Sequence, residues 1–371
     1  SYEAMREKLL QDRTIQNMAH LGARAFPEIS GEVVQTTAFV MQGKHLNGFK
    51  PVFFRLVDTG QDQKETELRS GLNRFDSTIQ DDFKKIPGSP IAYWASQQNL
   101  KSFSEFQLLE NVGLVRQGAS TSDNDRFLRR WYEVSKSKLG LNINSLKESI
   151  ESKKKWFPYN KGGDYRKWYG NCEYIINYEN DGYDLKEFQS TLNQGWTARL
   201  KSREYYFKNT VSWSKITSSL FSTRYYPDGF IFDVAGCCYF PDVQKGYNSF
   251  EVLAYLNSKV ASSTLKLLSP TMNYEIEHIK KLPILDKPIT IKENQSFFDI
   301  SKNDWDSYET SWDFTQNPML RTHQPNLRQA FNIWQKQNAD AVAEMKRLEE
   351  ENNKLFIDAY GLQDELTPDV P

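Results

Sequence analysis

The spacing of hydrophobic and polar residues changes along this chain, and each spacing predicts a helix, a strand or a turn. Residues 1–25 place apolar side chains at helical spacing. The β-branched runs 32–42 and 51–58 predict two antiparallel strands joined as a hairpin, and a polar helix is expected at 63–72. Structure-breaking residues then indicate a linker that leads into a short aromatic strand. They are Pro87, Gly88 and Pro90.

The second part of the chain has a different pattern. Short β-rich runs bounded by turn residues occur at 174–179, 204–213, 218–227 and 229–241, which is typical of a small curved sheet or barrel. One amphipathic helix is expected at 251–268, because its apolar residues recur at helical spacing. This part of the chain therefore predicts a β-rich domain closed by a helix.

Two further segments stand apart. Residues 151–171 interleave cationic and aromatic side chains with Gly, Pro and Asn, and we expect an extended, exposed loop there. Residues 326–360 carry an apolar stripe at alternating steps of three and four, which predicts one long helix ended by Gly361 in the left-handed conformation. The polar Asn338 and Asn352 interrupt that stripe, so we expect packing within the molecule rather than a dry coiled coil.

Charge changes this picture more than bulk composition does. The 371-residue chain has 47 basic and 48 acidic residues, yet residues 116–228 carry a net charge of +7 and residues 286–371 one of −7. A basic segment of this kind points to a polyanionic partner. Aromatic residues make up 14% of the chain, and we expect some to stack against a ligand. The candidates are Trp156, Tyr159, Trp168, Tyr225 and Tyr226.

Several classes of site find no support in the sequence. Four scattered histidines and three cysteines, without a C-x-x-C or H-x-x-x-H pair, give no reason to expect a metal or a disulfide framework. Phosphate-binding glycine motifs and a G-x-S-x-G nucleophile elbow are absent. The sequence has no apolar run long enough for a bilayer and no signal-peptide pattern at its start, so we expect a cytoplasmic protein without a membrane partner.

Blocks in the first half resemble adenine-specific DNA methyltransferases that act on the amino group of the base. NMAHLGARAFPEISGEVVQTTAFVMQ (17–42) is similar to the stretch that follows the catalytic Asn-Pro-Pro-Tyr motif of that family. FKKIPGSPIAYWAS (83–96) and GLVRQGASTSDNDRFLRRWYEV (113–134) resemble the entry to the target recognition domain of type IIG enzymes.

Blocks in the second half extend the resemblance in the same order. AYLNSKVASSTLKLLSPTMNYEIEHIKKLPI (254–284) looks like the closing element shared with specificity subunits of restriction systems. SKNDWDSYETSWDF (301–314) and EENNKLFIDAYGLQDELTPDV (350–370) are similar to the PglX methyltransferases of BREX phage-defence systems.

The resemblance implies a mixed α+β, multi-domain fragment of an enzyme that uses S-adenosylmethionine. The family's methyl-donor motif and its Asn-Pro-Pro-Tyr are missing from this sequence, and residues 317–320 (NPML) lack the second proline and the aromatic residue. We therefore expect no cofactor in this chain and no methylation by it alone. The implied domains are 1–60, the last strands of the catalytic domain; 61–115, a linker and entry to the recognition domain; 116–285, the target recognition domain; and 286–371, a helical support or spacer.

Duplex DNA is the partner that the basic segment and the resemblance favour together, with other phage-defence proteins as further candidates. The turn at 118–123 is well suited to cap the element that follows it. Arg126, Arg129 and Arg130 are expected to act together on DNA phosphates. The full set of expected DNA contacts is Arg116, Ser120, Thr121, Asn124, Arg126, Arg129, Arg130, Lys153, Lys154, Lys155, Lys161, Arg166, Lys167, Arg199, Lys201, Arg203, Arg224 and Tyr225.

Two other functions stay open on the sequence alone. In the first, the basic face docks an acidic protein of a defence complex, and competition with duplex DNA would separate the two cases. In the second, a carbohydrate-binding β-domain accounts for the many aromatic residues but not for the lysines and arginines among them.

Overall fold

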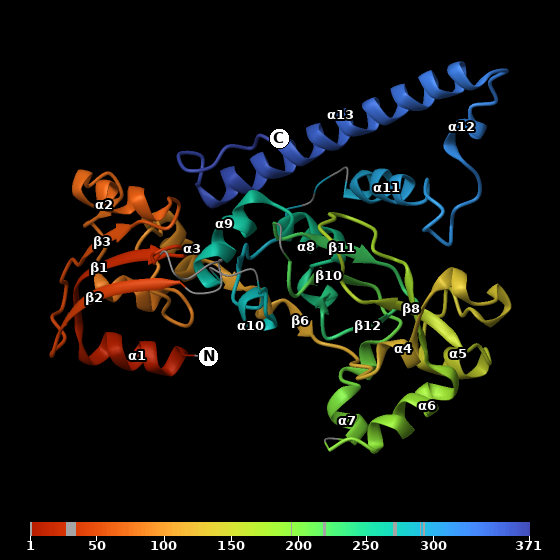
Figure 1. Ribbon diagram of the computed structural model, residues 1–371, viewed down its shortest axis with the longest axis horizontal. Coiled ribbons are helices and arrows are strands. Elements are labelled where there is room, and N and C mark those ends of the chain that lie inside the picture. The colour runs from red at the N-terminus through yellow and green to blue at the C-terminus, as the bar shows by residue number, and fades with distance from the viewer. Residues whose placement is uncertain are drawn as a thin grey trace. The chain divides into compact units, whose positions relative to one another are not determined.

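The computed structural model describes residues 2–26, 35–193, 195–217, 220–269, 273–289, 291 and 294–371. The chain divides into two compact units, Ser1–Phe106 and Gln107–Pro371 (Figure 1). Both units combine helices with strands, which confirms the predicted α+β class. The division falls inside the segment 61–115 that the sequence predicts as a linker.

The first unit contains a four-stranded sheet. Its strands are β1 (Thr14–Gly22), β2 (Thr36–Gln42), β3 (Val52–Arg55) and β4 (Arg74–Phe75). The order is β2-β1-β3-β4, with β1 antiparallel to β2 and parallel to β3. The predicted β2–β3 hairpin is therefore wrong. The strand that separates the two is β1, whose residues the sequence assigned to a helix, and a nine-residue apolar pattern does not by itself distinguish these states.

Helical segments complete the first unit. They are α1 (Glu3–Asp12), α2 (Gln61–Ser70), a 3-10 turn at Gln80–Lys85 and α3 (Gln97–Glu105). The predicted polar helix is confirmed by α2. The predicted aromatic strand after Pro90 is wrong, because residues 91–96 form turns and place Tyr93 in the core instead. There the Tyr93 ring stacks on Phe53 with 4.5 Å between ring centroids.

In its described residues, the second unit forms two four-stranded sheets and one two-stranded sheet. Its strands are β5 (Gln107–Leu108), β6 (Gly113–Arg116), β7 (Leu128–Arg130), β8 (Trp156–Asn160), β9 (Tyr174–Asn177), β10 (Thr210–Ser214), β11 (Thr223–Tyr226), β12 (Ile231–Phe232), β13 (Gly236–Pro241) and β14 (Pro283–Ile284). The strand orders are β11-β10-β13-β6, β12-β8-β9-β7 and β14-β5. The β-rich character expected of this part of the chain is therefore present.

The extended, exposed loop predicted at 151–171 is wrong in its first half. All five residues of β8 are buried. Phe157 and Tyr159 lie in the main core, while Trp156 packs with Leu139 and Ile175 in a second cluster. A strand buried on both faces shows no alternation of polar and apolar residues, so its sequence resembles a loop when charged residues flank it.

The turn after β6 lies against two other segments through backbone hydrogen bonds. Ala119 N donates to Phe232 O at 2.7 Å, and Ser120 N donates to Arg199 O at 2.9 Å. Gly118 leaves no space for a side chain, because a Cβ built there would lie 1.8 Å from Phe232 O. The turn is therefore fixed by close approach of backbone to backbone, which only glycine permits at this position.

Ten helices are described in the second unit. They are α4 (Asn124–Phe127), α5 (Leu146–Glu151), α6 (Glu179–Ser190), α7 (Gly195–Arg199), α8 (Ser249–Leu256), α9 (Lys259–Leu268), α10 (Ile276–Ile279), α11 (Asn294–Trp305), α12 (Pro318–Arg321) and α13 (Leu327–Tyr360). The single helix predicted at 251–268 is in fact α8 and α9. The chain breaks because Asn257 bonds to the backbone of Thr223 and the Ser258 hydroxyl caps α9.

The long helix α13 confirms the prediction for the C-terminal region, and it packs on α9 and α11 (Figure 1). The Asn326 side chain caps its start, and Gly361 ends it with a left-handed φ of 66°. Leu348 and Phe356 on its second half are buried. Asn352 is also buried there, and its Nδ2 donates to Ala254 O at 3.0 Å, so this interruption of the stripe serves packing within the molecule, as expected.

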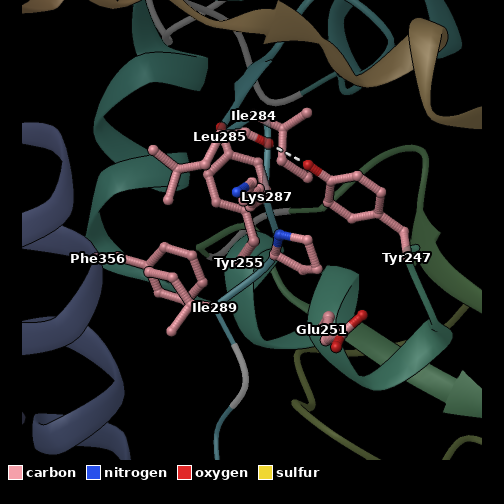
Figure 2. A pocket seen from close by; sticks show the side chains of 9 residues that line it. Tyr247, Glu251, Tyr255, Ile284, Leu285, Lys287, Ile289 and Phe356 are labelled. Carbon is pink, nitrogen blue, oxygen red and sulfur yellow. Dashed lines mark hydrogen bonds between the residues drawn. The ribbon is translucent and has the colours of Figure 1, made fainter. Parts of the chain in front are cut away.

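Little space remains where α13 meets the closing segment of the unit. Figure 2 shows Phe356 of α13 and Tyr255 of α8 beside a small cavity, with the Tyr247 hydroxyl donating to Leu285 O. The cavity measures about 10 Å³, which is the volume of about one water probe. This joint is therefore a packing contact and has no room for a cofactor.

Replacing Asn352 with alanine is expected to destabilise the protein by about 1–2 kcal/mol, because Ala254 O would lose its buried donor. Urea unfolding of the full chain measures this change. The control is Asn338→Ala on the same helix, where the side chain is exposed and the expected effect is within about 0.5 kcal/mol. Equal effects of the two variants would contradict the packing role of Asn352.

Candidate nucleic-acid interface

Several predicted contacts gather around the turn between β6 and α4. The Asp123 carboxylate accepts from Arg126 N at 3.1 Å and so caps α4, as the sequence predicts for this turn. Arg126 is exposed, with its guanidinium 4.9 Å from the centroid of the Phe188 ring. Thr121 is buried and its hydroxyl donates to Asn124 Oδ1 at 2.6 Å. The predicted contacts in this group are Ser120, Thr121, Asn124, Arg126 and Arg199.

A second group lies at one end of the β8–β9–β7 sheet. Arg130 of β7 is the cross-strand partner of Tyr174 in β9, and its guanidinium is 4.2 Å from the centroid of that ring. Lys161, directly after β8, places Nζ 5.0 Å from the same ring. Glu173 forms an ion pair with Arg130. We call Arg130, Tyr174 and Lys161 the basic row; with Glu173 included it keeps a net positive charge.

Arg129 does not belong to the basic row. Its guanidinium donates to Asp125 O at 2.5 Å and to Leu128 O at 2.6 Å, and lies 5.8 Å from the Trp156 ring centroid. Consecutive residues of a strand point to opposite faces of its sheet, so Arg129 and Arg130 face away from each other. The three arginines that were expected to act together therefore do not share one face.

Two predicted contacts are bound instead to the acidic end of the chain. Arg166 forms an ion pair with Asp304 in α11, and Lys167 Nζ lies 2.8 Å from Glu349 Oε2 in α13. Part of the charge asymmetry along the sequence is therefore satisfied inside this unit.

Other cations are held by carboxylates of α6. Arg203 donates two hydrogen bonds to Asp181, each of 2.5 Å, and Lys186 binds the same carboxylate. Burial on its own would raise the pKa of Asp181, but the hydrogen bonds from Lys186 and Arg203 bring this pKa below its ordinary value. Lys155 Nζ lies 3.6 Å from Glu179 Oε2. We therefore expect these ion pairs to stabilise the fold before they contribute to any binding.

Arg224 must be removed from the expected DNA contacts. It is fully buried, and its guanidinium donates to Arg166 O at 3.2 Å and to Ser214 Oγ at 3.1 Å, so it cannot reach a phosphate. Tyr225 is half-buried, with its ring stacked on Phe250 at 4.8 Å between centroids. The other stacking candidates are buried as well. They are Trp156, Tyr159, Trp168 and Tyr226.

The remaining predicted contacts lie outside both groups. Arg116 places its guanidinium 5.2 Å from the Tyr205 ring centroid. Lys154 Nζ donates to Ser137 O at 2.6 Å, whereas Lys153 and Lys201 are exposed. Because they are exposed, these two lysines are available to a phosphate.

Among the residues that the structure describes, no three His, Cys, Asp or Glu side chains gather as a set of metal ligands. None of the described helices is both long and apolar enough to cross a bilayer. The three cysteines are buried and unpaired, and burial raises the pKa of Cys172 to about 12, so its thiol is not a ready nucleophile.

Comparison with known proteins places this geometry in a family context. The adenine-specific methyltransferase PglX of Lacticaseibacillus casei (strain Zhang) is 42% identical over a match that takes in 100% of this chain and 31% of PglX. Over its full length, this chain is similar to that part of PglX. The adenine-specific methyltransferase BrxX of Escherichia coli O9:H4 (strain HS) is 39% identical over 99% of the chain and 29% of BrxX. The chain thus spans less than a third of either relative. No protein-family model matches it.

Solved structures of restriction-modification enzymes also align with this chain. The type IIL enzyme MmeI, solved in complex with DNA, aligns with 99% of this chain and 46% of its own, at a TM-score of 0.46 and 10% identity. The type IIG restriction endonuclease BpuSI aligns with 97% of this chain and 45% of its own, at a TM-score of 0.32 and 12% identity.

Sequence reasoning missed residues that organise the second unit. Tyr174 joins the two cations of the basic row, but only the strand register brings it beside Arg130. Glu349 seemed an ordinary acidic position of a long helix, although it is buried and binds Lys167. In the sequence, only its place among the apolar residues of the helix could have indicated burial.

Proposed function

We propose that this chain is the DNA target recognition part of a site-specific adenine DNA methyltransferase from a BREX or related phage-defence system. It binds duplex DNA in the cytoplasm so that another part of the enzyme can methylate a flipped adenine. One observation carries the proposal: the whole chain matches an adenine-specific methyltransferase at 42% identity.

The geometry of the second unit supports this function. The basic row and the exposed Arg126 are cations beside aromatic rings, an arrangement suited to the phosphate backbone, where most contacts position the protein without reading sequence. Carboxylates within the chain bind Arg166, Lys167 and Arg203, and we assign these three a structural role. Arg130 also pairs with Glu173, but Lys161 of the basic row forms no ion pair with a described carboxylate.

The proposal also assigns roles along the chain. S-adenosylmethionine belongs to the full-length enzyme, and this chain by itself is expected not to methylate, since its sequence contains no Asn-Pro-Pro-Tyr. The proposed domains are 1–60 as the end of the catalytic domain, 61–115 as a linker, 116–285 as the recognition domain and 286–371 as a helical support.

Binding of the full chain to duplex DNA across a range of salt concentrations tests the function. We expect affinity to fall as salt rises, and expect Arg130→Ala with Lys161→Ala to weaken binding to all sequences and to reduce the slope of log K against log salt by about 2. The control pair Lys346→Ala with Lys354→Ala removes two exposed lysines of α13 and should leave the slope unchanged.

Affinity that does not depend on salt would refute the phosphate contacts of the proposal. A shift in the preferred sequence caused by the Arg130 and Lys161 changes would mean that the basic row reads bases rather than phosphates. The rival function, docking of an acidic protein of the defence complex, uses the same cations. It is supported if such a protein binds the wild-type chain and duplex DNA fails to displace it.

A further inference from the structure

The loop at 161–171 between β8 and β9 has a strained backbone. Trp168 adopts a left-handed φ of 70°, which is unfavourable for a bulky residue, and Asn171 one of 59°, which asparagine tolerates better than most residues. Gly163 and Gly170 reach 135° and 132°, values open in practice only to glycine. A conformation of this kind persists only where the surroundings determine it, and here they do so from two sides.

Side chains of strand β11 form hydrogen bonds with the backbone of the loop. The buried Arg224 donates to Arg166 O at 3.2 Å, and the buried Tyr226 hydroxyl donates to Gly170 O at 3.1 Å. Arg224 has no ion pair with any described carboxylate, so its guanidinium serves mainly to bind backbone and hydroxyl oxygens. We assign it as a positioning residue for this loop.

The C-terminal helices hold the same loop from the other side. Glu349 of α13 accepts from Trp168 Nε1 at 2.7 Å and from Lys167 Nζ at 2.8 Å. The Trp168 ring stacks on Phe297 of α11, with 4.0 Å between centroids and 18° between planes. Each side chain from 166 to 168 is therefore engaged inside the unit.

The tip of the loop is exposed to solvent. Gly163, Asp164 and Tyr165 are exposed, with 43% of the Tyr165 surface open to solvent. Within the described part of the chain, the Asp164 carboxylate and the Tyr165 hydroxyl form no hydrogen bond, whereas the Asp164 carbonyl accepts from Asn171 Nδ2 at 3.0 Å. The loop thus presents one free acceptor and one free hydroxyl, three and four residues along the chain from Lys161 of the basic row.

We propose that Asp164 and Tyr165 read base edges of duplex DNA, and that Glu349 is a positioning residue that fixes the loop for this readout. A carboxylate accepts from the amino group of cytosine, and a phenolic hydroxyl can donate or accept at a base edge. The inference rests on the proposed function and deepens it. It makes the C-terminal helices part of the sequence-reading apparatus rather than a spacer.

Selection of bound sequences from a pool of randomised duplexes by the full chain tests this readout. The variants are the pair Asp164→Ala with Tyr165→Ala, the single change Glu349→Gln, and the control Tyr308→Ala, which removes another exposed tyrosine of the same unit. We expect the pair to lose about 5-fold or more in discrimination at one or two base pairs, with the salt slope unchanged. Glu349→Gln should reduce the same discrimination, and the control should reduce none.

The outcomes separate the two proposals. A wild-type chain that shows a clear sequence preference, left intact in the Asp164 and Tyr165 pair, overturns this inference alone. A wild-type chain without preference or without DNA binding overturns the proposed function as well. A thermal unfolding midpoint close to wild type shows that a variant has kept its fold, and the Asp164 and Tyr165 pair, exposed on the surface, should meet this condition even if Glu349→Gln does not.

Discussion

Replacing Glu349 with alanine is expected to lower the free energy of unfolding by about 3 kcal/mol, because the change leaves Lys167 and the Trp168 indole without their shared acceptor in a buried setting. Both partners are largely buried, with 20% of the Lys167 side chain and 11% of the Glu349 side chain exposed, so solvent replaces the lost contacts poorly. Urea unfolding of the full chain, followed by tryptophan fluorescence, measures the loss.

The matched control for this change is Glu351→Ala, two residues along the same helix. Glu351 pairs with Arg347 on the exposed face, where half of each side chain is open to solvent. An exposed pair of this type contributes less than about 1 kcal/mol. A loss from Glu349→Ala no larger than from Glu351→Ala would show that Glu349 does not hold α13 to the 161–171 loop.

Replacing Gly118 with alanine is expected to cost about 3 kcal/mol and to weaken DNA binding, since the new Cβ would lie 1.8 Å from Phe232 O. The turn must then move away from β12, and it carries Ser120 and the cap of α4 with it. Differential scanning calorimetry and DNA binding of the full chain report the two effects.

Gly43→Ala is the control for this substitution, because no atom lies within 4 Å of the Cβ it would add. This variant should unfold within about 0.5 kcal/mol of the wild type. A Gly118→Ala variant as stable as Gly43→Ala would mean that the turn is not fixed by its contact with Phe232.

The candidate site was only partly predictable from the sequence. The turn that caps α4, the basic character of the middle segment and the exposed Arg126 follow from residue types in local order. From the sequence alone, we predict that the cations of this segment form one set of DNA contacts. The structure separates them into the basic row, whose Arg130 pairs with Glu173, other cations held by carboxylates, and the buried Arg224, because a partner distant in sequence determines the role of each.

Local pattern by itself determined the long helix α13 with its Gly361 cap and the polar helix α2. Helical period and capping depend on neighbours within a few residues, so the sequence records them directly. Only the tertiary structure decided that β1 lies between β2 and β3, that β8 is buried on both faces, and that Glu349 binds the 161–171 loop. Strand order, burial and long-range ion pairs depend on which distant surfaces meet, and periodicity along one segment carries no record of that choice.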